Sequence, residues 1–156
     1  IHAYAEAKEK GSGGSAMIKE IKDLLDIDVH YYAVVDFNGF ERIIDELGGV
    51  DVVVERDLID NQYPIRGKES IYPIENRFET LVIKQGEQHM DGELALKYAR
   101  SRHANGIEGS DFARSARQQK IIIALKNKVI SLDTLLSPTR IKSLLNAYTN
   151  HIKTNL

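Results

Sequence analysis

The 156-residue sequence contains no cysteine, no long apolar run and little net charge. The absence of cysteine excludes disulfides, thiolate metal sites and cysteine nucleophiles. No run approaches the 18 apolar residues or so that a membrane-spanning helix needs, and no signal peptide is visible. The formal net charge of −2 does not favour a long polyanion such as nucleic acid as a partner.

The composition fits one globular domain. Apolar residues make up 42% and charged residues 28% of the sequence, which is ordinary for a folded domain with its own core. The sequence begins with Ile1, in the middle of a pattern. We therefore expect a piece of a longer protein, whose missing part would include any targeting segment.

Periodic apolar patterns predict a layered α/β fold. Helical spacing favours helices over Ser15–Leu25, Phe40–Leu47, Asp91–Tyr98 and Phe112–Ile130, with a further helix starting at Pro138. Runs of β-branched and aromatic residues predict strands over Val29–Phe37, Val50–Val54 and Phe78–Ile83. The strand–helix–strand order of residues 29–54 resembles a βαβ unit. We therefore expect an αβα layered domain with a central mixed β-sheet flanked by helices.

Four segments lack a clear period. Asp57–Asn76 is typical of a long surface excursion, with room for a short edge strand. Lys84–Gln88 is predicted to be a turn, and Thr134–Leu136 to interrupt the helical pattern. Lys10–Ser15 is rich in glycine and serine, which favours a flexible connector. A phosphate-cradling loop is disfavoured there, because no Lys-Ser/Thr pair follows the glycines.

The basic segment Tyr98–Gln119 concentrates the chemistry of the chain, with four arginines, one histidine and two acids. Arg100 and Arg102 share a face if their backbone is extended. Arg114, Arg117 and Gln118 have i, i+3, i+4 spacing and share a face of the next helix. They lie in its first turns, where unpaired N–H groups and the helix dipole favour an anion. This arrangement predicts a phosphate or pyrophosphate site.

Structural interpretations of the basic segment, without a bound anion, stay open. Its arginines could form a solvated face, paired with Asp91, Glu108 and Asp111. The intervening loop Asn105–Gly109 favours the anion site, because it allows the two arginine pairs to converge. Asp111 is expected as an N-cap, with Ser110 as the alternative cap. It could also orient a guanidinium or help to activate a hydroxyl. His103 could act as a general acid or base, although polar surface is the simpler interpretation.

The sequence contains several distinctive blocks in a fixed order. They are HYY and VDFNGF within His30–Phe40, LGGVDV at Leu47–Val52, GEQHMDG at Gly86–Gly92, YARSRH at Tyr98–His103, and SDFAR with RQQK within Ser110–Lys120. Together, although any one alone would be weak, these blocks resemble the LytR-CpsA-Psr family of bacterial cell envelopes.

The resemblance implies a phosphotransferase that moves glycopolymers, such as teichoic acid or capsular polysaccharide, from a polyprenyl-pyrophosphate carrier to peptidoglycan. It also implies a core that holds the lipid in an apolar tunnel, and assistance by Mg²⁺. By motif, Arg100 and Asp111 would be catalytic. The pyrophosphate ligands would be Arg100, Arg102, Arg114 and Gln118, with Arg117 and His103 in support.

By the same resemblance, residues 1–156 would form the C-terminal two-thirds of one family domain. The upstream part would carry the carboxylates that hold magnesium, so no metal ligand is predicted in this chain. We expect the fragment alone to be inactive and to bind magnesium weakly. The intact protein would lie on the extracytoplasmic face of the bacterial membrane, anchored by a transmembrane helix absent from this chain.

Two other functions stay open. One is a non-catalytic module that binds polyprenyl phosphate without transfer. The other is an envelope-related transcriptional regulator, against which the net charge of −2 and the lack of a recognisable helix-turn-helix both count.

Overall fold

The computed structural model describes residues 13–131, 136–139, 141–142 and 152–155. The chain forms two compact units, which are described separately. One comprises Ile1–Phe40 with Leu145–Leu156, and the other comprises Glu41–Leu144. Most of the predicted break at Thr134–Leu136, and most of the helix predicted from Pro138, lie outside the described residues.

The first unit contains helix α2 (Gly13–Leu25) and the antiparallel pair β1 (Ala33–Val35) and β6 (Ile152–Thr154). Helix α2 was predicted closely. Strand β1 is shorter than the predicted Val29–Phe37, because Asp36 begins the next helix: its Oδ1 accepts a hydrogen bond from Gly39 N at 2.6 Å. That helix, α3, spans Phe37–Glu46.

The second unit holds two antiparallel strand pairs. Strand β2 (Val50–Val54) has the predicted bounds and pairs with β5 (Gly86–Met90), with Val50 opposite Met90. The prediction of a turn over Lys84–Gln88 was therefore wrong for its second half. Strand β5 is mostly polar, and its extended conformation comes from hydrogen bonding to β2 rather than from a local apolar pattern.

The other pair is β3 (Leu58–Pro64) with β4 (Phe78–Ile83), interrupted by a register shift between Asp60 and Tyr63. The predicted excursion Asp57–Asn76 thus begins with a strand and ends in the short 3-10 helix η1 (Ile74–Arg77). The βαβ-like unit was also wrong, because β1 pairs with β6 and β2 with β5. In the described residues the strands form three two-stranded antiparallel sheets instead of one mixed sheet.

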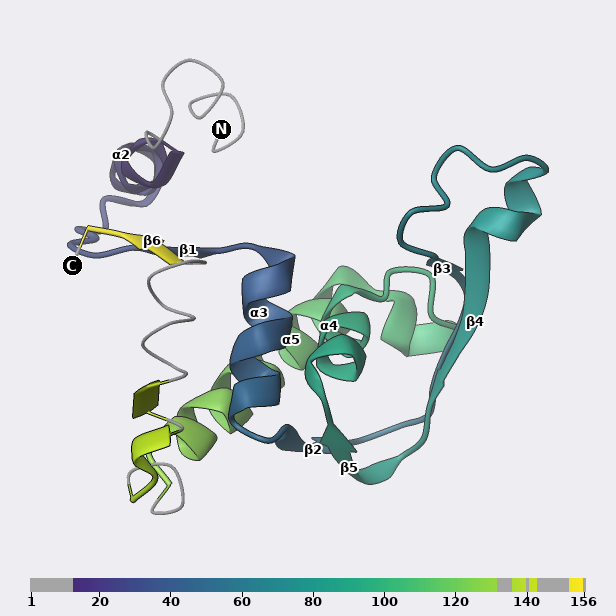
Figure 1. The fold of residues 1–156 in the computed structure, drawn as a ribbon. Helices are drawn as coiled ribbons and strands as arrows, with labels where there is room; N and C mark the ends of the chain where they lie inside the picture. The colour runs from purple at the N-terminus through teal and green to yellow at the C-terminus, as the bar shows by residue number, and fades with distance from the viewer. Residues whose placement is uncertain (1–12, 132–135, 140, 143–151, 156) are drawn as a thin grey trace. The chain divides into compact units, whose positions relative to one another are not determined.

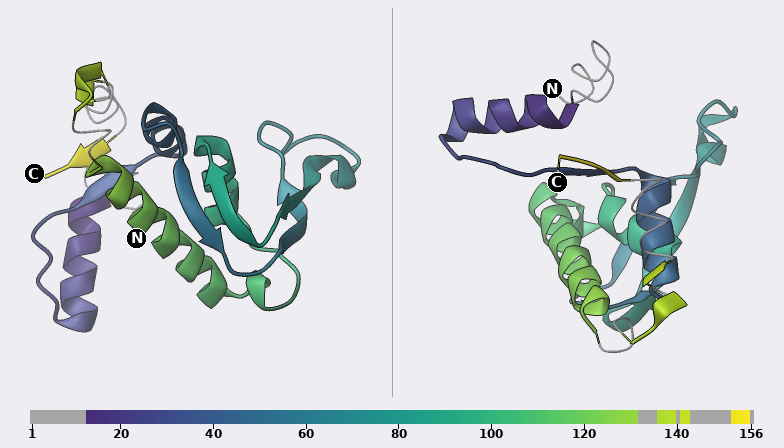
Figure 2. Two further views of the ribbon diagram at one scale, coloured as in Figure 1. Left: turned by 90° about the horizontal axis from the view of Figure 1, so that it is seen from below. Right: turned by 60° about the vertical axis from the view of Figure 1, so that its left-hand side comes forward.

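Two helices pack on the β2–β5 pair and on each other: α4 (Gly92–Arg100) and α5 (Asp111–Val129). Figures 1 and 2 show α5 running beside β2. The predicted α/β class is confirmed. Burial of one Val, Leu or Ile side chain contributes about 1.5–3 kcal/mol. The fully buried apolar residues of this core include Ile44, Leu47, Val50, Leu58, Met90 and Ala95.

Helix α4 lies very close to α3. A Cβ at Gly92 would collide with the backbone of Glu41, so only glycine permits this approach. The Gly92 amide also donates to Asp45 Oδ1 at 2.7 Å. None of the helices in the described part of the chain is long and apolar enough to cross a membrane.

Candidate functional site

The first arginine of the basic segment, Arg100, is the last residue of helix α4. Asp91, where the sequence predicts this helix to begin, is its N-cap, because its Oδ1 accepts a hydrogen bond from Leu94 N at 2.8 Å. The helix continues to Arg100, and the Ser101 amide still donates to Lys97 O at 3.0 Å. Arg100 is therefore helical, so it does not share an extended strand with Arg102 as the sequence pattern suggested.

Helix α5 begins with the predicted alternative cap. Ser110 is the N-cap, and its Oγ accepts a hydrogen bond from Ala113 N at 3.2 Å. Asp111 is the first helical residue, with a side chain that is 80% exposed. Its carboxylate forms an ion pair with Arg114 Nη1 at 2.8 Å. Asp111 therefore orients the Arg114 guanidinium at the positive end of the helix dipole.

Arg117 is only 2% exposed and holds the basic segment together. Its Nε donates to Tyr98 O at 3.0 Å, and its Nη2 donates to Ser101 O at 2.7 Å. Its Nη1 donates to the backbone oxygen of Glu108 at 2.7 Å and to Glu108 Oε2 at 2.9 Å. Arg117 thus binds carbonyls on both sides of Arg100 and supports the site from within.

A second buried group, Asp60 of strand β3, also holds this segment. The residue is 0% exposed. Its Oδ2 accepts hydrogen bonds from Ser101 Oγ at 2.7 Å and from His103 N at 3.2 Å, and its Oδ1 accepts one from Gln62 N at 3.0 Å. Ser101, between the two arginines, is therefore fixed through its hydroxyl by Asp60 and through its carbonyl by Arg117.

The remaining predicted residues surround this fixed segment. Gln118 Nε2 donates to Ala99 O at 3.3 Å, which ties α5 to the residue before Arg100. The Arg102 and His103 side chains are exposed and make no hydrogen bond or ion pair with other described residues. The loop predicted between the arginine pairs contains the 3-10 helix η2 (Gly106–Gly109). It is tightly closed, because a Cβ at Gly109 would collide with Ala104 O.

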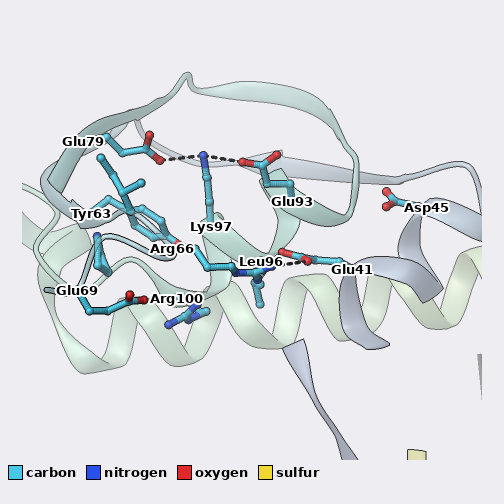
Figure 3. Close-up of a pocket in the computed structure, with 12 residues that line it drawn as sticks. Glu41, Asp45, Tyr63, Arg66, Glu69, Glu79, Glu93, Leu96, Lys97 and Arg100 are labelled. Carbon is cyan, nitrogen blue, oxygen red and sulfur yellow. Dashed lines mark hydrogen bonds and ion pairs between the residues drawn. The ribbon is translucent and has the colours of Figure 1, made fainter. Parts of the chain in front are cut away.

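The Arg100 side chain lines a pocket of about 520 Å³ (Figure 3). The pocket is bounded by α3, α4, β3 and β4 and by the loop after β3. Lys97 lies across it, with Nζ 2.8 Å from Glu79 Oε1 and 2.9 Å from Glu93 Oε1. These two carboxylates raise the pKa of Lys97 well above its usual value, so the ammonium stays charged.

Tyr63 also lines this pocket and is only 6% exposed. Burial raises the pKa of its phenol, against an opposing effect of Arg100 and Lys97, so the hydroxyl stays protonated at neutral pH. The Lys97 ammonium lies 6.0 Å from the centroid of the Tyr63 ring. Within the described residues, the Tyr63 hydroxyl has no hydrogen-bond partner.

The side chains in the described part of the chain do not fit a magnesium site. Mg²⁺ requires several oxygen ligands converging in octahedral geometry. No group of three or more acidic, histidine or cysteine side chains converges in this way among the residues that the structure describes.

Sequence reasoning missed Asp60 and Tyr63 and did not foresee the burial of Arg117. Asp60 lies two residues after the buried Leu58, so strand alternation would have placed it on the inner face. Arg117 lies four residues before the buried Ile121, and hence on the buried stripe of α5. The sequence allowed a short edge strand somewhere within Asp57–Asn76 but did not fix its position, so the alternation could not be applied to Asp60.

The sequence model of the LytR_cpsA_psr family matches residues 2–156. The chain belongs to the LytR-CpsA-Psr family. This assignment confirms the resemblance carried by the motifs around Arg100 and Arg114.

Curated LytR-CpsA-Psr relatives share about a third of their residues with the chain. The polyisoprenyl-teichoic acid–peptidoglycan teichoic acid transferase TagV of Bacillus subtilis is 31% identical over 150 residues, which cover 96% of this chain and 34% of TagV. The regulatory protein MsrR of Staphylococcus aureus is 34% identical over 141 residues, covering 88% of this chain and 37% of MsrR. The chain thus spans about a third of the length of these relatives.

Solved structures of LytR-CpsA-Psr proteins have the same fold. The crystal structure of B. subtilis TagV has a TM-score of 0.64 and 28% identity, and the match covers 97% of this chain and 49% of that one. The structure described as TagT bound to LIIa-WTA has a TM-score of 0.60 and 26% identity, with 99% and 50% of the two chains covered.

Proposed function

We propose that the intact protein is a phosphotransferase that attaches a glycopolymer from a polyprenyl-pyrophosphate carrier to peptidoglycan. Membership of the LytR-CpsA-Psr family supports this class of activity, because the relative TagV is named as a polyisoprenyl-teichoic acid–peptidoglycan teichoic acid transferase. We further propose that the protein works at the extracytoplasmic face of the membrane, where peptidoglycan and its lipid-linked precursors meet.

The observation that carries the proposal is the fixed backbone between Arg100 and Arg102. Arg117 and Asp60 hold Ser101 from two sides, and Gln118 ties α5 to Ala99. The backbone that carries Arg100 and Arg102 is thereby fixed to α5, whose first turns carry Arg114. Guanidinium groups on a rigid backbone are suited to binding the two phosphates of a pyrophosphate.

In the proposed reaction, an acceptor hydroxyl oxygen forms a bond to the phosphorus that bears the glycopolymer. The bond from that phosphorus to the bridging oxygen breaks, and polyprenyl phosphate leaves with the electron pair. The acceptor proton passes to a base. Arg100, Arg102 and Arg114 stabilise the charge that develops on the leaving phosphate. Asp111 positions Arg114 through their ion pair.

We also propose Mg²⁺ as a cofactor of the intact protein, with its ligands outside the residues that the structure describes. The ion would supply charge neutralisation at the pyrophosphate. The roles proposed for Arg100, Arg102, Arg114 and Asp111 do not depend on where the magnesium ion binds.

Transfer of a lipid-linked glycopolymer to peptidoglycan by the intact protein tests the proposal. Wild-type protein should give a covalent product, and Arg100→Ala should reduce its rate by about 100-fold or more. Arg42→Ala, an arginine outside both the pocket and the basic segment, serves as the matched control. Transfer that persists in Arg100→Ala would contradict the residue roles, and no product from wild-type protein would contradict the activity.

The same assay distinguishes the second candidate, a protein that binds lipid-linked phosphate without transferring it. One relative, MsrR, is named as a regulatory protein and not as a transferase, so the printed names do not attribute transfer to every relative. Retention of labelled lipid pyrophosphate by the protein, without product on peptidoglycan, would support it.

A further inference from the structure

The pocket beside Arg100 is a separate feature of the second unit. Every residue that lines it lies between Glu41 and Arg100, and its volume is about 520 Å³. Small-molecule sites in proteins commonly measure about 300–1,000 Å³. The pocket is therefore large enough to hold a ligand group next to the arginine that we propose to bind pyrophosphate.

Its walls combine charged and apolar side chains, and among the charged ones acids outnumber bases. Arg66 is bound by both oxygens of Glu41, at 3.1 and 2.8 Å, and Lys97 is bound by Glu79 and Glu93. Because these cations are already neutralised, the pocket does not favour a second anion. The lining carboxylates belong to Glu41, Asp45, Glu69, Glu79 and Glu93.

The Tyr63 hydroxyl distinguishes this pocket from an ordinary acidic surface. The side chain is 6% exposed, and Figure 3 shows its ring directed toward Arg66 and Lys97 inside the pocket. Its hydroxyl makes no hydrogen bond with any residue that the structure describes. Buried polar groups normally have a partner, so an orphaned donor that lines a cavity indicates a ligand atom.

We propose that this pocket binds a neutral pyranose of the transfer substrates, with the Tyr63 hydroxyl donating a hydrogen bond to a sugar oxygen. The proposal rests on the transferase function proposed above. A neutral sugar presents many hydroxyls, which donate to carboxylates such as that of Glu69 and accept from phenols and cations. A position next to Arg100 places the sugar beside the pyrophosphate.

Two substrates could supply this sugar: the glycopolymer unit attached to the carrier, and the peptidoglycan acceptor. The variant Tyr63→Phe separates them, because it removes one oxygen and keeps the shape of the ring. Loss of one hydrogen bond should raise one KM by about threefold to tenfold with little change in kcat. The melting temperature should not fall, because the hydroxyl has no partner in the described part of the protein.

The experiment measures transfer by the intact protein, varying the lipid-linked donor and soluble peptidoglycan disaccharide fragments in turn. A raised KM for the fragments assigns the pocket to the acceptor, and a raised KM for the donor assigns it to the glycopolymer. Tyr72→Phe, which removes a hydroxyl from a tyrosine that is 84% exposed and outside the pocket, is the control and should change neither KM. Unchanged KM values in Tyr63→Phe would overturn the proposal.

Direct binding keeps the two proposals distinguishable. If wild-type protein transferred nothing, the proposed function would fail, and titration calorimetry with the disaccharide fragments and with a water-soluble, short-chain donor would still test the pocket. Weaker binding of either sugar to Tyr63→Phe than to wild-type protein would support the sugar site. Equal binding by both proteins, or none by either, would overturn it.

Discussion

Arg114 and Arg117 lie one turn apart on helix α5, yet they occupy different environments. The Arg114 side chain is 27% exposed and forms an ion pair with Asp111, whose side chain is 80% exposed. Arg117 is 2% exposed and donates to three backbone carbonyls and one carboxylate. One guanidinium can therefore reach a ligand, whereas the donors of the other are occupied by the protein itself.

This difference shows that the charge of an arginine cluster does not reveal its role. A buried guanidinium must have its donors satisfied by the fold, because an unpaired buried charge is very unfavourable. A partly exposed one keeps donors for an anion. The comparison predicts that substitutions in the buried region act on stability, and that those at the exposed end act on function.

The largest effect is expected for Arg117→Ala. The substitution leaves the carbonyls of Tyr98 and Ser101 and the carboxylate of Glu108 without their donor. Removal of one partner of a buried ion pair typically costs about 3–5 kcal/mol. The free energy of unfolding from urea denaturation should fall by this amount. Arg117→Lys should recover only a part, since an ammonium cannot reproduce the planar fork.

Asp60→Asn should have the next largest effect. An amide offers one oxygen where the carboxylate offered two, so its NH2 group would face the donor of Ser101, His103 or Gln62. The free energy of unfolding should fall by about 1–3 kcal/mol. Asp57→Asn is the matched control on the surface and should change it less. Equal losses in the two variants would contradict the proposed support by Asp60.

Arg114→Ala should reduce activity with little effect on stability, in contrast to the two substitutions of buried residues. Its ion pair with Asp111 is partly exposed, with side chains that are 27% and 80% exposed, and such surface pairs contribute less than about 1 kcal/mol. We expect an almost unchanged free energy of unfolding together with a loss of polymer transfer of about 100-fold or more. A destabilisation as large as that of Arg117→Ala would remove the distinction between the two ends of the helix.

The smallest effect concerns the exposed pair of Asp51 and His89, with Oδ1 and Nδ1 2.6 Å apart. The hydrogen bond from His89 lowers the pKa of Asp51, so this contribution is complete above the unfolded-state pKa near 4 and lost as pH falls through the folded value. Asp51→Asn should therefore destabilise by less than about 1 kcal/mol at pH 7. The difference from wild-type protein should shrink below about pH 4 in urea titrations.

The elements that could be predicted from sequence are those specified by local signals. Strands β2 and β4 have the predicted bounds, because each is a short run rich in β-branched and other apolar residues. Helices α4 and α5 begin at side-chain caps that the sequence displays. Strands β3 and β5 are more polar and are extended mainly because β4 and β2 pair with them, so a single-sequence pattern could not define them.

Only a part of the candidate site could likewise be predicted from the sequence. The motifs located the basic segment and the family, and these depend on residue type and spacing. The burial of Arg117 and the reach of Asp60 from strand β3 depend on contacts between segments far apart in sequence. The pocket around Tyr63 likewise combines α3, α4, β3 and β4, so no local pattern indicated it.

The two-sided anchoring of Ser101 has a kinetic consequence. The backbone between Arg100 and Arg102 takes its conformation when the chain folds, since its partners Asp60 and Arg117 are internal. In the proposed function, a pyrophosphate that binds these arginines does not have to order a loop first. Its association rate should therefore be set by diffusion and electrostatic attraction rather than by a preceding conformational step.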